Sequence, residues 1–170
     1  MSTELNVDLV GPERADEVVG VIHRALAARP KLDPPGPAGD ETVESVAKVL
    51  AAVGGLLATR RGYPIGAILF DQSRPGQLGL KRVSVDPQGR DRGVASAMVG
   101  VAEDFAEERG ADGIWLHVRE ELPENLRFWA HRFYRPISQV GSTIEFAKTL
   151  WLAREIPDAD QMRLFASKVA

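Results

Sequence analysis

Residues 80–99, LKRVSVDPQGRDRGVASAMV, carry the strongest chemical signal in the chain. An extended apolar run ends at Val85, because Pro87 has no amide hydrogen for a strand ladder. Gly89 and Gly93 bracket the turn that follows, and apolar residues at helical spacing predict a helix directly after Gly93. The first amides of a helix have no partner within it and sit at the positive end of its dipole. This segment therefore predicts a site for a phosphate or pyrophosphate.

Two basic residues, Arg90 and Arg92, add positive charge to this turn. A P-loop is excluded, because no Gly-Lys-Ser or Gly-Lys-Thr follows. A dinucleotide-binding fold is excluded because Gly-x-Gly-x-x-Gly is absent. The sequence predicts a phosphate-binding turn of a different kind.

Arg90, Gly93 and Ala95 fit the pattern Arg/Gln-x-x-Gly-x-Gly/Ala, which here follows an apolar strand and Val-x-Pro. The segment resembles the acetyl-CoA-binding motif of the GCN5-related N-acetyltransferase (GNAT) superfamily. The resemblance implies that the strand backbone binds the pantetheine arm and that the turn amides bind the pyrophosphate. The cofactor-binding residues implied here are Val83, Ser84, Val85, Arg90, Asp91, Arg92, Gly93, Val94, Ala95 and Ser96.

The segment from Asn125 to Trp129 resembles the second cofactor motif of the family, with Asn125, Phe128 and Trp129 as implied cofactor residues. In one register, Trp129 stands where many members carry a tyrosine near the thioester sulfur, and Phe133 replaces a glycine. An indole N–H has no accessible proton for the leaving thiolate, so a general acid would be missing. In the other register Tyr134 is that acid, which makes Tyr134 the candidate.

Acetyl transfer to an amine also needs a group that removes a proton from the ammonium form. Glu120 follows a predicted strand at 113–118, whose end the resemblance places near the thioester, and is the first candidate base. His117, within that strand, is the second. The chain has no cysteine and no second histidine at metal-binding spacing, so we expect direct transfer and no metal site.

Apolar alternation and turn signals predict the order strand, two helices, three strands, helix, strand, helix and two strands. This order resembles that of the superfamily and implies an α+β fold over residues 1–150. The expected core is a mixed, mostly antiparallel sheet of about seven strands flanked by helices. A proline-rich loop over 30–40 is either a wall of the acceptor site, through residues 32–38, or a plain surface loop. Asp40 is expected to cap the helix after it.

The length, composition and net charge of the chain limit the classes of molecule that it is expected to bind. With 170 residues, 44% of them hydrophobic, the chain is long enough for one domain with a substantial core. A net charge of −3 with interspersed signs gives no general attraction to nucleic acid or to an anionic membrane. No signal peptide and no run of about 20 apolar residues is present, so we expect a cytoplasmic protein.

Residues 151–170 are predicted to form a helical tail that docks on the domain or on a second copy in a homodimer. The segment 156–166 resembles the opening of the ATPase subunit of the tRNA threonylcarbamoyladenosine pathway, which implies a fused ATPase domain as partner. Two functions follow from the resemblances. The first is an N-acetyltransferase that uses acetyl-CoA and a small-molecule or protein amine of unknown identity. The alternative is an acetyl-CoA-binding regulatory or structural module with little catalysis.

Overall fold

The computed structural model describes residues 4–150, and the predicted tail lies outside the described residues. Helices and strands follow the expected order along the chain. Their bounds are β1 (Leu5–Val10), α1 (Ala15–Ala27), α2 (Val43–Ala52), β2 (Gly55–Arg60), β3 (Tyr63–Asp71), β4 (Gln77–Val85), α3 (Val94–Glu108), β5 (Gly113–Arg119), α4 (Pro123–His131), β6 (Arg135–Val140) and β7 (Thr143–Thr149). Short 3-10 turns lie at Pro12–Arg14, Pro37–Asp40 and Pro87–Gly89.

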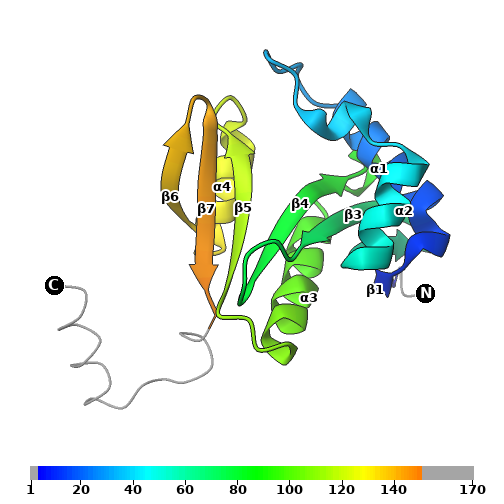
Figure 1. The fold of residues 1–170 in the computed structure, drawn as a ribbon. Helices are drawn as coiled ribbons and strands as arrows, with labels where there is room; N and C mark the ends of the chain where they lie inside the picture. The colour runs from blue at the N-terminus through cyan, green and yellow to red at the C-terminus, as the bar shows by residue number, and fades with distance from the viewer. Residues whose placement is uncertain (1–3, 151–170) are drawn as a thin grey trace, which may run out of the picture.

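The seven strands form one sheet in the order β1-β2-β3-β4-β5-β7-β6 (Figure 1). Only β4 and β5 run parallel, and all other neighbouring pairs are antiparallel. The parallel pair requires a crossover, which α3 supplies. This architecture confirms the predicted α+β class and the mixed, mostly antiparallel sheet.

Helices cover both faces of the sheet. Adjacent residues of β2 point to opposite faces, so Leu56 packs in a core with Met98 of α3, and Leu57 packs in a second core with Ile22 of α1. Trp129 of α4 belongs to the same core as α3. Thus α1 and α2 cover one face, and α3 and α4 cover the other. No helix among residues 4–150 is long and apolar enough to span a membrane.

The start of α2 differs from the prediction. Thr42 accepts the Ser45 amide at 3.0 Å, and the Ser45 hydroxyl accepts the Thr42 amide at 2.9 Å. This reciprocal capping satisfies two amides that a helix start leaves unpaired. The predicted cap at Asp40 is wrong, because Asp40 ends the preceding 3-10 turn and α2 begins only at Val43.

The parallel strands β4 and β5 diverge along their length. They pair from Gln77–Gly113 to Leu80–Leu116, and no further pair joins them (Figure 1). A register shift between β3 and β4 falls where Arg82 adopts a positive φ of 52°. Such a bulge bends a strand away from its neighbour. The last residues of β4 therefore pair with β3 alone.

Candidate active site

The turn after β4 is anchored to α1 by a buried carboxylate. Asp86 is 3% exposed and accepts hydrogen bonds from Arg24 Nε at 2.5 Å and from the Gln88 amide at 2.9 Å. Burial by itself would raise the pKa of Asp86, but these hydrogen bonds outweigh burial and lower the pKa. Arg90 also reaches α1, where its guanidinium donates to the Ala25 carbonyl at 3.3 Å. The turn is thus held by contacts on its α1 side.

Helix α3 begins without a side-chain cap. Its N-cap residue is Gly93, at a φ of 73°, and none of the side chains that the structure describes caps it. A Cβ at Gly93 would meet no atom within 4 Å, so the backbone conformation rather than space favours glycine. In contrast, α2 of the same chain caps itself through Thr42 and Ser45. The amides at the start of α3 are therefore open to an external acceptor.

The residues predicted from the first motif lie together because they are contiguous in the chain. Val83 and Val85 are half-buried against the core, and the Ser84 hydroxyl donates to the Arg82 carbonyl at 2.8 Å. Val94 is buried, and Ala95 is half-buried. The exposed members are Arg90, Asp91, Arg92, Gly93 and Ser96. The unpaired side of β4 thus leads directly into the open helix start.

Sequence reasoning missed a basic hollow beside this turn. Arg60, Arg61 and Tyr63 line it with Arg92, and its volume is about 600 Å³. Arg60 Nε is buried and has no hydrogen-bond partner among the described residues. Two adjacent arginines, Arg60 at the end of β2 and Arg61 in the turn after it, were the only sequence signal. Their distance from Arg92 along the chain gave no indication that the three side chains line one hollow.

The segment from the second motif supplies an exposed amide and two aromatic rings. Asn125 is exposed, Phe128 is half-buried, and Trp129 is 4% exposed. The Phe128 and Trp129 rings meet edge to face, with centroids 5.0 Å apart. Trp129 packs in the core formed with α3, and its predicted contact with the cofactor stays a prediction.

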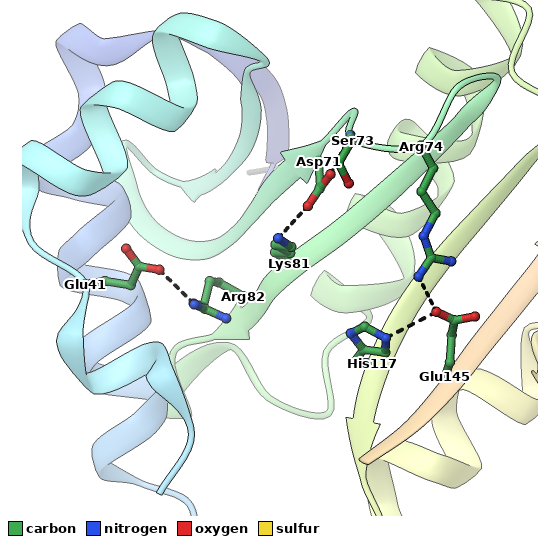
Figure 2. Close-up of polar contacts among 8 residues, drawn as sticks. All are labelled: Glu41, Asp71, Ser73, Arg74, Lys81, Arg82, His117 and Glu145. Carbon is green, nitrogen blue, oxygen red and sulfur yellow. Dashed lines mark hydrogen bonds and ion pairs between the residues drawn. The ribbon is translucent and has the colours of Figure 1, made fainter. Parts of the chain in front are cut away.

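The two candidate bases occupy separate surroundings. Glu120 is exposed, and its carboxylate accepts a hydrogen bond from Gln139 at 2.8 Å, in the β6–β7 hairpin. His117 is also exposed, and its Nε2 lies 3.2 Å from Glu145 Oε1 (Figure 2). Arg74 forms an ion pair with the same carboxylate and is the main cause of its lowered pKa. No contact joins Glu120 to His117, and both roles stay predictions.

A further carboxylate, missed in the sequence, lies beside the β4 bulge. Glu41 accepts a hydrogen bond from Arg82 Nε at 2.8 Å (Figure 2). It accepts another from the Ser45 hydroxyl at 2.7 Å. Its side chain is only 14% exposed. No local pattern marks Glu41, because its partner is 41 residues away in the sequence.

The proline-rich loop contacts the end of β5. Arg119 donates to the Pro34 carbonyl at 2.9 Å and to the Asp33 carbonyl at 3.3 Å. The loop between α1 and α2 is thereby attached to the sheet where β4 and β5 have diverged. These contacts agree with the interpretation of the loop as a wall of the site.

A sequence model of the acetyltransferase (GNAT) family matches residues 25–133. This chain belongs to the GNAT acetyltransferase family. The match includes the β4–α3 turn and all of α4. Comparison with curated protein sequences gave no match.

Solved structures of GNAT proteins share the fold. The PaiA N-acetyltransferase of Thermoplasma acidophilum, in complex with coenzyme A, aligns with a TM-score of 0.75 at 13% identity, covering 86% of this chain and 99% of that one. Ard1 of Thermoplasma volcanium aligns at 0.71 and 15% identity, covering 86% and 97%. The ribosomal-protein-S18-alanine N-acetyltransferase of Escherichia coli gives the same score and identity, covering 86% and 94%. At these identities the likeness concerns the fold alone.

The end of α4 decides between the two registers of the second GNAT motif. The Phe133 amide donates to the Ala130 carbonyl, and the Tyr134 amide donates to the Trp129 carbonyl at 3.0 Å. Phe133 lies between them at a φ of 69°, in the conformation that usually selects glycine at a helix end. This geometry favours the register in which Phe133 replaces the glycine of the family.

Tyr134 therefore occupies a packing position in this GNAT domain. It is 2% exposed, and its hydroxyl donates to Glu103 of α3 at 3.0 Å. Burial, followed by the charge of Glu103, raises the pKa of Tyr134 strongly. A buried hydroxyl that donates to a carboxylate is poorly placed to protonate a leaving thiolate, and the acid role of Tyr134 stays a prediction.

Proposed function

We propose that this chain transfers an acetyl group from acetyl-CoA directly to an amine. The supporting observation is the uncapped start of α3, at Gly93, next to the side of β4 that has no strand partner. A backbone edge that continues into open helix amides suits a ligand with an amide-containing arm and a pyrophosphate.

Backbone groups would make most of the ligand contacts. In this proposal the edge at Val83–Val85 binds the pantetheine arm, and the amides from Gly93 to Ser96 bind the pyrophosphate. Asn125 and Phe128 of α4 would contact the arm from its other side. The buried, unpaired Nε of Arg60 supports the adjoining hollow as a place for a further phosphate.

Acetyl-CoA supplies a thioester carbonyl to which the amine adds. A C–N bond forms and the C–S bond breaks, the amine nitrogen loses a proton, and the thiolate gains one. Glu120 stays the predicted base. His117 stays the second candidate, and Glu41 is a third, because its ion pair with Arg82 places it at the bulge where β4 leaves β5.

A second function has one specific observation in its favour. Trp129 occupies the position where the resemblance places a tyrosine, and the nearby hydroxyl of Tyr134 is bonded to Glu103. A chain without an acid for the thiolate would bind acetyl-CoA and transfer little of its acetyl group. This alternative is a binding module with a regulatory or structural role.

Calorimetric titration with acetyl-CoA tests the proposed site. We expect a Kd on the order of 1 μM for the unaltered protein. Gly93→Asp should weaken binding about 100-fold, because it places a carboxylate in the anion site and strains a left-handed position. Gly110→Asp is the matched control, since Gly110 has the same φ of 73° at the other end of α3. Equal weakening in both variants, or no binding by the unaltered protein, would contradict the proposal.

Release of the coenzyme A thiol then distinguishes the two proposed functions, an acetyltransferase and a binding module. The chain has no cysteine, so a thiol-reactive dye reports only the coenzyme A that transfer releases. Release that depends on an added amine supports the enzyme. Tight binding without such release supports the module.

A further inference from the structure

Three arginines from distant parts of the sequence lie along the segment between α1 and α2. Arg82 lies at the β4 bulge and pairs with Glu41, just before α2. Arg119 ends β5 and donates to carbonyls of the α1–α2 loop. Arg29 follows the end of α1, and its guanidinium lies 3.5 Å from the place of a Cβ at Gly36 of the same loop. The segment between α1 and α2 thus contacts all three.

These three cations are unequally compensated. Arg82 has Glu41 at 2.8 Å, and Arg119 has Glu121 at 3.1 Å. Arg29 forms no ion pair with any residue between 4 and 150, and its Nε is buried without a hydrogen-bond partner among them. Two carboxylates therefore face three guanidinium groups.

The environment of Arg29 opposes its charge. Burial lowers the pKa of Arg29, and the positive charges of Arg119 and Arg82 lower it further. A guanidinium that keeps its charge beside two others, with a buried donor unsatisfied, is unfavourable unless an anion joins it. Its planar pair of N–H donors matches the two oxygens of a carboxylate.

The position of this cluster suggests what the anion belongs to. The cofactor proposed above approaches the turn before α3, whereas Arg29 and Arg119 lie against the loop between α1 and α2. The bridge from Arg119 to Pro34 and Asp33 attaches that loop to β5 and so restricts the space for an extended polypeptide. A small acceptor suits this arrangement better than a protein chain.

We propose that Arg29, flanked by Arg82 and Arg119, binds the carboxylate of a small acceptor, so that the substrate is an amino acid or a related amino-carboxylate. This inference rests on the proposed acetyl transfer, and it specifies the acceptor class of the same site. Arg29 binds and orients the acceptor and takes no part in proton transfer.

Matched acceptors test the proposal. Each amino acid of a panel is compared with its own amide by coenzyme A release, so that each pair differs in the carboxylate. We expect kcat/KM to favour the acid about tenfold or more. Arg29→Gln should remove this preference by raising the KM for the acid, and Arg29→Lys should keep part of it. Arg135→Gln, an exposed change on β6, should leave the preference intact.

A second measurement does not depend on turnover. In protein labelled with nitrogen-15 at arginine and saturated with coenzyme A, the Arg29 Nε–H signal is followed during titration with N-acetyl amino acids and their amides. Arg29→Gln identifies the signal. We expect a shift with the acids only.

Several results would overturn the inference while leaving acetyl transfer intact. These are equal use of acids and amides, no shift of the Arg29 signal, preference for O-phosphoethanolamine over amino acids, or acetylation of acidic peptides but of no free amino acid. A protein that fails to bind acetyl-CoA in calorimetry contradicts the proposed function itself, and the inference fails with it.

Discussion

Helices α3 and α4 lie on the same face of the sheet and end in the same way, yet they begin differently. At the end of α3, Gly110 and Ala111 donate to carbonyls of the last turn, each at 2.9 Å. At the end of α4, Phe133 and Tyr134 make the equivalent bonds at 3.1 and 3.0 Å. The left-handed residue is Gly110 at a φ of 73° in one helix and Phe133 at 69° in the other.

This difference indicates that the two helices contribute to the proposed site in different ways. Glycine at both ends of α3 leaves its backbone accessible, and the amides at its start face no side-chain cap. Helix α4 also lacks a side-chain cap, but its first residue, Pro123, has no amide hydrogen to offer a ligand. It ends on packed rings, with the centroids of Trp129 and Tyr134 4.9 Å apart. In our proposal α3 binds by its backbone, whereas α4 contributes mainly packing.

The largest effect should come from the anchor of the turn before α3. Asp86→Asn breaks the ion pair with Arg24 while the side chain stays buried, and we expect a loss of about 2 kcal/mol in the free energy of unfolding. Urea unfolding at pH 7 measures it. Asp91→Asn, an exposed change in the same segment, is the matched control and should stay within about 0.5 kcal/mol. Equal losses in both variants would show that the anchor is unimportant.

The same variant makes a prediction about pH. The pKa of Asp86 is lowered in the folded state, so its contribution is fully present above the unfolded value of about 3.9 and is lost as the pH falls below it. Unaltered protein should therefore lose more stability than Asp86→Asn between pH 6 and about pH 3. If the free energies of unfolding of the two proteins changed in parallel with pH, that result would contradict a lowered pKa of Asp86.

A smaller effect is expected where α4 joins β6. Tyr134→Phe removes the hydrogen bond to Glu103, which keeps Lys148 as a partner at 3.0 Å, so we expect a loss of about 1 kcal/mol in stability. The kcat for acetyl transfer should not change. Tyr63→Phe, at the half-exposed second tyrosine, is the control. A fall in kcat of about 100-fold would restore Tyr134 as the acid.

The smallest effect on stability is expected when the residue types at the two left-handed positions, Phe133 and Gly110, are exchanged. Phe133 is 79% exposed, so Phe133→Gly sacrifices little packing and relieves a left-handed conformation. We expect the free energy of unfolding to rise by about 0.5 kcal/mol. This net gain is what remains of the relieved strain, because glycine also increases the entropy of the unfolded chain. The reverse change, Gly110→Phe, should cost a similar amount, since a Cβ there meets no atom within 4 Å. Melting temperatures compare the two, and a loss on Phe133→Gly would mean that the ring stabilises the helix end.

Features carried by neighbouring residues were predictable from the sequence. The turn between β4 and α3 depends on Pro87, Gly89 and Gly93, whose backbone preferences act locally, and the order of helices and strands along the chain followed from alternation and turn signals. The same local reasoning misplaced the start of α2, where Asp40 and Thr42 are both suitable caps and the capping partner Ser45 decided between them.

By itself, the sequence determined the order of the elements and the turn between β4 and α3, because each depends on short-range periodicity or on the dihedral limits of glycine and proline. Its resemblance to the GNAT superfamily implied the class of fold. Only the tertiary structure decided that Tyr134 bonds Glu103 and that Arg29, near Arg82 and Arg119, has no ion-pair partner between residues 4 and 150. Those outcomes depend on which side chains the β4 bulge and the diverging strands bring together. The electrostatic energy of a charged group depends on burial and on partners distant in the chain, and a linear sequence specifies neither locally.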